Sequence, residues 1–148
     1  MHNRIMEKAL EQAKLALLSG DVPVGAVMVY EGKIIACAHN EREKTGDPTA
    51  HAEVLAIRRA AEALQRRRLN GCTLYVTLEP CPMCAGAIVM SGVERVYFGA
   101  YDPRMGCTGS VYALTEDPVF GANISCIGGV CEQMCSKIVT DFFAARRA

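Results

Sequence analysis

The sequence predicts a three-layer α/β/α domain, in which helices cover both faces of a mixed five-stranded sheet. Short runs of apolar and β-branched residues alternate along the chain with longer segments whose apolar residues recur every three or four positions. Strands that alternate with helices in this way are typical of layered α/β domains. The 148 residues, 51% of them hydrophobic, suit one compact core, so we expect a single domain over residues 1–148.

The expected elements follow from this periodicity and from the turns between them. In chain order they are a helix over 1–18, strands over 26–30 and 33–38, a helix over 49–65, a strand over 73–77, a helix over 81–90, strands over 95–99 and 123–127, and a helix over 131–146. Gly20 ends the first helix, whose apolar stripe runs from Met6 to Leu17. Glu31-Gly32 joins the first two strands into a β-hairpin.

The second helix is preceded by a polar loop over 39–48, and Thr49 is its expected N-cap. We expect Asn70-Gly71 to close this helix before the buried strand over 73–77. The buried stripe of this helix is expected to comprise Val54, Ile57, Ala61 and Leu64.

The C-terminal part holds a helix that is apolar on most sides and stops at Gly92. The segment 100–122 is rich in Gly, Pro and Asp, and we expect one short helix in it, around 111–114. This long connection leaves room for the crossover that a parallel fifth strand requires. The last helix is expected to bury Met134, Ile138 and Phe142.

Charge and composition restrict the partners. Sixteen basic and sixteen acidic residues cancel, so a nucleic-acid substrate would have to be bound by a local patch. The N-terminus lacks the apolar core of a signal peptide, and no apolar run approaches the roughly 20 residues that span a bilayer. We expect a cytoplasmic protein without membrane contact, whose eight cysteines stay reduced or bind metal.

Three residues form a candidate metal site. Cys81 and Cys84 lie in the first turn of a predicted helix, where the helix dipole favours thiolates. His51 supplies a third ligand at the start of the preceding helix. Structural zinc sites usually have four protein ligands, and catalytic ones have three with a water in the fourth position. The set therefore predicts a catalytic zinc site with one Zn²⁺ per chain.

Glu53 completes a catalytic arrangement. Zinc acidifies a bound water, and a carboxylate beside it can accept the proton. The same carboxyl can deliver protons to a ring nitrogen and to a departing amine, which is hydrolytic deamination. His51-Ala52-Glu53 followed by Pro80-Cys81-Pro82-Met83-Cys84 matches the H-x-E and P-C-x-x-C signature of zinc-dependent nucleobase deaminases.

These motifs resemble the cytidine deaminase-like superfamily, and further segments are similar to the bacterial tRNA-specific adenosine deaminases within it. The segments that carry the resemblance are Val22-Pro23-Val24-Gly25-Ala26, His39-Asn40, Asp47 to Glu53, Thr77-Leu78-Glu79-Pro80-Cys81, Phe98-Gly99-Ala100, Asp102-Pro103-Arg104, Gly109-Ser110, Asp141-Phe142-Phe143 and Arg146-Arg147. The resemblance covers nearly the whole chain and implies hydrolysis of the wobble adenosine of tRNA to inosine.

The resemblance also implies substrate contacts. Asn40 should hydrogen-bond the adenine, Asp102 should lie near the ribose, and the backbone of Ala52 should meet the base edge. The remaining contacts are expected from Val24 and Ala26 in the base pocket, and from Arg104, Phe142 and Arg146-Arg147 beside the flanking nucleotides of the anticodon loop. It further implies a homodimer and no nucleotide cofactor.

Two other functions remain open from the residues. A deaminase of a free base or nucleotide, such as guanine, cytosine or a riboflavin precursor, would share the zinc site without an RNA surface. A zinc-stabilised binding module would have no use for Glu53. The remaining cysteines are expected to be buried thiols in place of a second metal cluster, with Cys107 the most reactive because it lies in a loop; they are Cys37, Cys72, Cys107, Cys126, Cys131 and Cys135.

Overall fold

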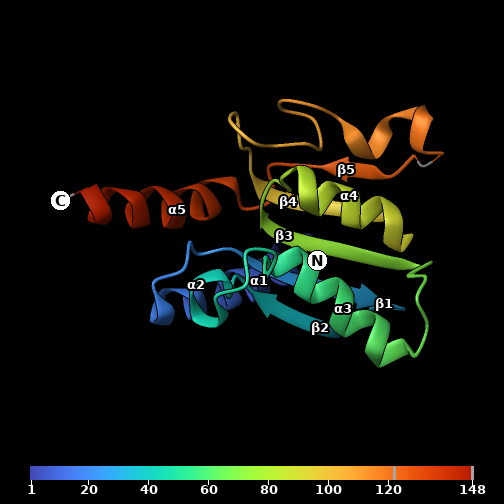
Figure 1. Ribbon diagram of the computed structural model, residues 1–148, viewed down its shortest axis with the longest axis horizontal. Helices are drawn as coiled ribbons and strands as arrows, with labels where there is room; N and C mark the ends of the chain where they lie inside the picture. The colour runs from blue at the N-terminus through green and yellow to red at the C-terminus, as the bar shows by residue number, and fades with distance from the viewer. Residues whose placement is uncertain (122, 148) are drawn as a thin grey trace.

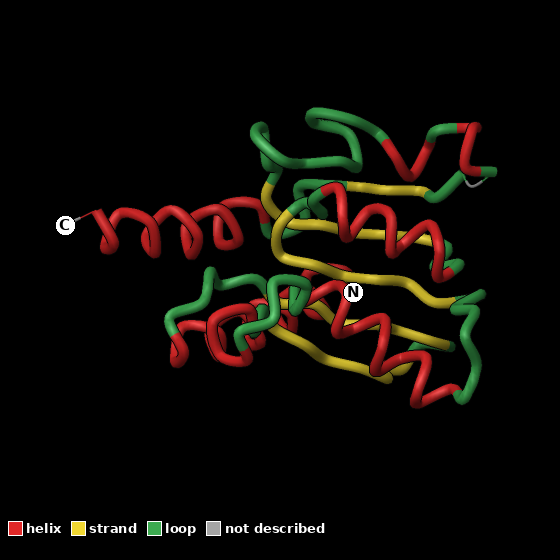
Figure 2. The backbone as a smooth tube through the Cα atoms, in the orientation of Figure 1, coloured by secondary structure: helices red, strands yellow, loops and turns green. Residues whose placement is uncertain are grey.

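The computed structural model of the protein describes residues 1–121 and 123–147, except for the side chain of Arg147. Figures 1 and 2 show the arrangement of its elements. In chain order these are α1 (His2–Ala16), η1 (Leu17–Ser19), β1 (Gly25–Tyr30), β2 (Lys33–His39), α2 (Arg42–Thr45), α3 (Ala52–Leu64), β3 (Cys72–Leu78), α4 (Pro82–Ser91), β4 (Arg95–Ala100), η2 (Leu114–Glu116), η3 (Pro118–Phe120), β5 (Ser125–Ile127) and α5 (Glu132–Arg147).

The five strands form one mixed sheet in the order β2-β1-β3-β4-β5. β1 pairs antiparallel with both β2 and β3, whereas β3-β4 and β4-β5 are parallel pairs. The predicted hairpin and the parallel fifth strand are therefore both confirmed. In the parallel half, the carboxyl ends of β3 and β4 meet at one edge of the sheet, and ligand sites of open α/β sheets commonly lie at this edge.

Helices cover both faces of the sheet, because neighbouring residues of each strand point to opposite sides. Val27 of β1 packs in a buried cluster with residues of α1 and α5, whereas Met28 packs on the other side with residues of α3 and α4. Figure 1 shows α3 and α4 in front of the strands. The predicted three-layer α/β/α arrangement is confirmed.

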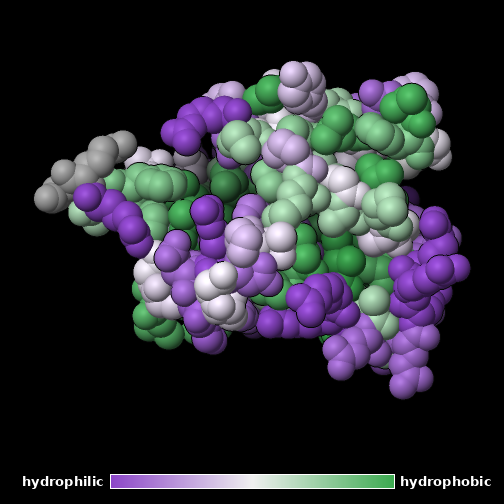
Figure 3. All heavy atoms as spheres, in the orientation of Figure 1, coloured by the Kyte–Doolittle hydropathy of each residue, from purple (hydrophilic) through white to green (hydrophobic). Residues whose placement is uncertain are grey.

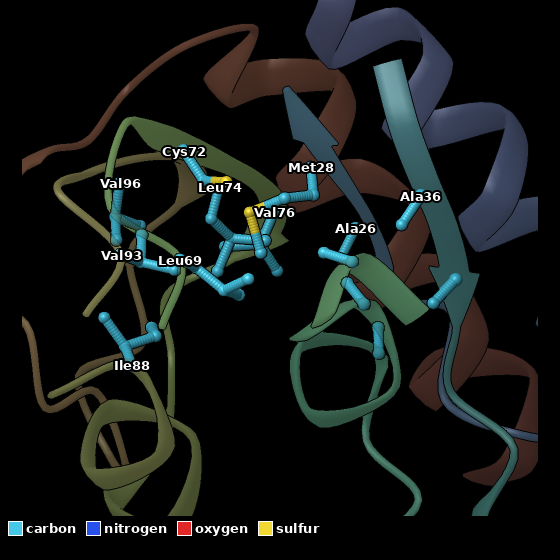
Figure 4. Packing of buried hydrophobic residues seen from close by; sticks show 14 of the residues in the cluster. Ala26, Met28, Ala36, Leu69, Cys72, Leu74, Val76, Ile88, Val93 and Val96 are labelled. Atoms are coloured by element: carbon cyan, nitrogen blue, oxygen red, sulfur yellow. The ribbon is translucent and has the colours of Figure 1, made fainter. Parts of the chain in front are cut away.

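The larger buried cluster lies between the sheet and the pair α3 and α4. Figure 4 shows how side chains from several elements gather there: Met28 of β1, Cys72, Leu74 and Val76 of β3, Ile88 of α4 and Val96 of β4, with Leu69 and Val93 from the connections. Fully burying an aliphatic side chain of this size stabilises a fold by about 1.5–3 kcal/mol. This core fixes α3 and α4 side by side with their N-termini near the edge of the sheet.

The structure corrects the sequence prediction for α3. His51, not Thr49, is the N-cap residue, and Gln65 in a left-handed conformation closes the helix in place of Asn70-Gly71. The predicted stripe is only partly buried. Small side chains pack against the sheet in its place, which lets the helix lie close to the strands; the buried apolar residues of α3 are Ala52, Ala56 and Ala60.

Three further predictions on local structure are wrong. The loop over 39–48 contains the short helix α2, and the helix expected around 111–114 is replaced by the 3-10 turns η2 and η3 further along the chain. On α5, Met134 is 50% exposed and Cys135 is fully buried, because the helix presents Cys135 to Gly99 of β4, where only a glycine leaves room. Among the described residues, no helix is long and apolar enough to cross a membrane.

Candidate metal centre and active site

The site is built where α3 and α4 begin. His51 is the N-cap residue of α3 and Cys81 is the N-cap residue of α4, both with extended backbone, and Pro82 fits the first helical position of α4 because it needs no N–H partner there. Cys84 follows one turn later and is fully buried. The two helix starts therefore bring their side chains together at the carboxyl end of β3.

The ligand atoms of His51, Cys81 and Cys84 all lie within 4.8 Å of one another. The Nδ1 atom of His51 is 3.6 Å from Cys81 Sγ and 3.5 Å from Cys84 Sγ. Zinc–sulfur and zinc–nitrogen bonds of about 2.3 and 2.0 Å at tetrahedral angles imply a nitrogen–sulfur separation of about 3.5 Å. The three side chains therefore fit a tetrahedral metal ion, with one coordination position left for a non-protein ligand.

Without a metal, the pKa values of the three ligand side chains are shifted in different directions. A hydrogen bond from the Cys84 thiol, supported by His51, lowers the pKa of Cys81 to about 4 although its burial acts in the opposite direction. The same hydrogen bond and burial raise the pKa of Cys84. The Cys81 thiolate in turn raises the pKa of His51. A metal ion must displace the protons of Cys84 and His51, because zinc binds thiolate and neutral imidazole.

Glu53 lies in the first turn of α3 and is only 4% exposed. Burial raises the pKa of its carboxyl to about 7, and the nearby Cys81 thiolate adds to this effect. A carboxyl group with a pKa near 7 exchanges protons efficiently at neutral pH. The site therefore places a proton carrier beside the three ligand atoms.

A cavity of about 320 Å³ opens beside these groups. Its wall includes nine of the thirteen residues predicted from the sequence: Val24, Asn40, His51, Ala52, Glu53, Cys81, Asp102, Phe142 and Arg146. Cys84 is a metal-site residue rather than a wall residue. Ala26 is fully buried in the core, and Arg104 is exposed, so neither lines the cavity.

The polar residues of the wall are held by the backbone. Asn40 donates from Nδ2 to the Val22 carbonyl (3.2 Å) and accepts from the Arg42 N–H (3.1 Å). The Oδ1 atom of Asp102 accepts from the N–H groups of Arg104 (3.0 Å) and Met105 (3.1 Å). These bonds fix the side chains before any ligand arrives, while Asn40 keeps a second N–H and Asp102 a second oxygen for further bonds.

The C-terminal helix α5 closes one side of the cavity. The Arg146 guanidinium lies 4.6 Å above the Phe142 ring and donates to the carbonyl of Gly20. Arg146 is thus engaged within the protein, and the side chain of Arg147 lies outside the described residues. Figure 2 shows α5 reaching beyond the sheet on the side where the C-terminus lies.

Sequence reasoning missed other residues at the cavity. Asp21 is fully buried and accepts hydrogen bonds from the N–H groups of Glu43 and Lys44, which orients α2 beside Asn40. Nothing in the sequence around Gly20-Asp21 signals this role. Glu79 and Met105 also line the cavity. Cys107, expected to be the most reactive of the remaining cysteines, is 1% exposed, and burial raises the pKa of its thiol.

Comparisons with known proteins decide the family. The model of the MafB19-like deaminase family matches residues 1–147. The tRNA-specific adenosine deaminase of Bacillus subtilis (strain 168) is 49% identical over 142 residues, which cover 96% of this chain and 88% of that protein. The chain belongs to the tRNA-specific adenosine deaminase family.

Solved structures agree with this assignment. One of them comes from biochemical and structural studies of A-to-I editing by tRNA:A34 deaminases. It superposes on this chain with a TM-score of 0.87 at 42% identity, covering 90% of this chain and 96% of the other. A guanine deaminase from Bacillus subtilis is 41% identical but reaches a TM-score of 0.65, covering 68% of this chain and 65% of the other. The chain therefore has the expected cytidine deaminase-like fold, and of these two structures the tRNA:A34 deaminase superposes with the higher TM-score.

Proposed function

We propose that the chain is a single zinc-dependent deaminase domain that hydrolyses the wobble adenosine of a tRNA anticodon loop to inosine. One observation carries this proposal. The ligand atoms of His51, Cys81 and Cys84 converge beside the buried carboxyl of Glu53, in a chain 49% identical to a tRNA-specific adenosine deaminase along almost its whole length.

One zinc ion per chain would be held by His51, Cys81 and Cys84, and it would lower the pKa of a water molecule so that the water attacks at neutral pH. Glu53 accepts a proton from the attacking water and donates it to the ring nitrogen beside the attacked C6 atom. Glu53 then takes the proton of the new C6 hydroxyl and passes it to the amino group, which leaves as ammonia while the C6 carbonyl of inosine forms. The raised pKa of Glu53, about 7, suits a group that must both accept and donate a proton.

Substrate recognition falls to side chains that the fold holds in place. Asn40 offers its free N–H to the purine, because its other polar contacts are already made to Val22 and Arg42. The free oxygen of Asp102 would accept a hydrogen bond from the ribose. Phe142 and Arg146 present a stacked surface at the cavity mouth, on which a flanking base can stack. Unpaired loop nucleotides suit such a cavity because little stacking is lost when one enters it.

The free-base alternative is not favoured. The guanine deaminase from Bacillus subtilis is 41% identical but covers only 68% of this chain, and the guanine deaminase from Nitrosomonas europaea covers 94% at only 22% identity. The tRNA-specific adenosine deaminase of Bacillus subtilis is 49% identical over 96% of the chain. The charges at the cavity mouth do not distinguish an RNA substrate from a free base, because basic and acidic residues alternate there in α2.

The proposal is tested by incubating the protein with an anticodon stem-loop that carries adenosine at the wobble position. Free adenosine, guanine and cytosine, and the same stem-loop with guanosine at that position, serve as controls. We expect inosine from the adenosine stem-loop alone. Turnover of a free base with no product from the stem-loop would contradict the proposal.

We further propose a homodimer. Helix α4 is apolar on nearly all sides, Met90 at its end is 80% exposed, and the 3-10 turn η3 exposes Val119 (77%) and Phe120 (53%). The space-filling view shows apolar residues on this part of the surface (Figure 3). An apolar face of this kind usually marks a protein interface. Met90→Glu should convert a dimer into a monomer in analytical ultracentrifugation, and a wild-type monomer at micromolar concentration would refute the dimer.

Cytoplasmic location stays part of the proposal. Its support is that all eight cysteines are free thiols in the structure, as expected of a reducing compartment.

A further inference from the structure

Glu79 is a buried acidic residue that neither the metal centre nor the proton transfer uses. It follows β3, is 2% exposed and lies two residues before Cys81. An acidic side chain is rarely buried to this extent unless its oxygens receive hydrogen bonds. The partners of Glu79 therefore indicate what it does.

Among the residues that the structure describes, the hydrogen-bond donors to the Glu79 carboxyl all come from one segment, 102–110, which we name the wall loop. Oε1 accepts from the Asp102 N–H (3.0 Å) and from the Ser110 hydroxyl. Oε2 accepts from the N–H groups of Thr108 (3.3 Å) and Ser110 (2.9 Å). A carboxylate has about four acceptor positions, so these four donors use its capacity.

The wall loop also packs directly on the carboxyl. A Cβ atom added at Gly106 would lie 2.3 Å from Cδ of Glu79, so any side chain there would displace the loop from the carboxyl. A backbone bond from the Cys107 N–H to the Pro80 carbonyl (2.8 Å) fastens the same loop beside Cys81. The loop is thus attached to the residues that lead into the metal ligand.

The wall loop carries part of the cavity. Asp102 and Met105 line it, and the Asp102 N–H is itself one of the four donors to Glu79. Asp102 in turn orders the next turn through its bonds to Arg104 and Met105. The distance between the metal ligands and this wall therefore depends on Glu79.

We propose that Glu79 is a positioning residue, which holds the wall loop at a fixed distance from Cys81 and so sets the substrate side of the cavity. The catalytic consequence rests on the proposed function, whereas the anchoring of the loop does not. Some interactions stabilise the bound substrate and the transition state equally. Loss of such an interaction raises KM and leaves kcat unchanged. Glu79 therefore governs KM, in contrast to Glu53, which governs kcat.

The test uses Glu79→Gln, which keeps the volume but replaces one acceptor oxygen by an NH₂ group facing the loop donors. Amide hydrogen exchange in the RNA-free protein should accelerate at Asp102, Thr108 and Ser110. With the adenosine stem-loop, KM should rise roughly 10- to 100-fold, the range for loss of a hydrogen bond to a charged group, with little change in kcat. Zinc content should stay at one per chain. Glu116→Gln, at an exposed site on η2, is the matched control.

Ser110→Ala removes a single hydroxyl donor and gives a milder version of the same effect. It carries the test if Glu79→Gln does not fold. Unchanged exchange and unchanged KM in the variants would overturn the proposal, as would loss of zinc with normal exchange in the wall loop. If the wild-type protein leaves the stem-loop unmodified, the proposed function fails, and the exchange measurement alone still decides whether Glu79 anchors the loop.

Discussion

Glu53→Gln isolates the proton-transfer step from zinc binding and from packing. Glutamine has nearly the same volume as glutamate, but its amide cannot take up a proton. Glu53 is 4% exposed, so bulk water has little access to replace its carboxyl. Burial raises its pKa to about 7, which makes it effective at neutral pH. We therefore expect kcat to fall by roughly 10²- to 10⁴-fold, or about 3–5 kcal/mol of barrier.

The assay is the single-turnover rate of inosine formation in the adenosine stem-loop, measured beside zinc content and thermal unfolding of the same preparations. Glu62→Gln is the matched control, because Glu62 is exposed on the same helix. Glu53→Gln should keep one zinc per chain and unfold at the wild-type temperature or above. A rate within about tenfold of wild type would refute the assignment of Glu53 as proton carrier. Loss of zinc together with activity would show that Glu53 retains the metal instead.

Two further predictions concern the metal and the sheet. Between about pH 5 and 6, Cys81 with its pKa of about 4 is already a thiolate, whereas the raised pKa values of His51 and Cys84 keep both protonated. Zinc must displace two protons there, so its affinity should rise roughly 100-fold per pH unit in competition with a chromophoric chelator; an affinity independent of pH would contradict this. Gly25→Ala should destabilise the fold by about 3 kcal/mol or more in urea unfolding, because its Cβ would lie 1.9 Å from the Ala9 carbonyl oxygen. Gly86→Ala, in open space on α4, should instead stabilise it by up to about 1 kcal/mol, and equal effects of the two changes would refute the close contact between α1 and β1.

The order of helices and strands could be predicted because it depends on local periodicity and turn residues. Gly20 and Gly92, expected to end helices, both adopt the left-handed conformation there. The metal ligands could be predicted because their chemistry is restricted to few residue types at a fixed spacing. The helix start at Cys81 agrees with the expected one, whereas α3 begins at His51 and not at the expected cap Thr49.

The side of α3 that faces the sheet could not be predicted from hydrophobicity alone. Its larger apolar residues, such as Val54 and Ile57, are only partly buried, whereas Ala56 and Ala60 are fully buried. The close approach of the helix to the strands selects small side chains, and this approach is a property of the whole fold. The same reason explains α5, where Cys135 is buried against Gly99 and Met134 is exposed.

The role of Glu79 also depends on long-range structure. The sequence shows an acidic residue before Pro80-Cys81, but its partners lie between 23 and 31 positions further along the chain. Only the folded wall loop brings their N–H groups to one carboxyl. The same holds for Asp21, whose carboxyl meets the start of α2 more than 20 positions away.

X-ray absorption at the zinc edge, combined with metal analysis of the active protein, tests the central claim most directly. We expect about one zinc per chain, bound by two sulfur atoms and one imidazole nitrogen, with a light atom in the fourth position. Removal of the zinc should abolish inosine formation, and its return should restore it. A fully active metal-free protein, or a zinc ion enclosed by four protein ligands, would contradict the account.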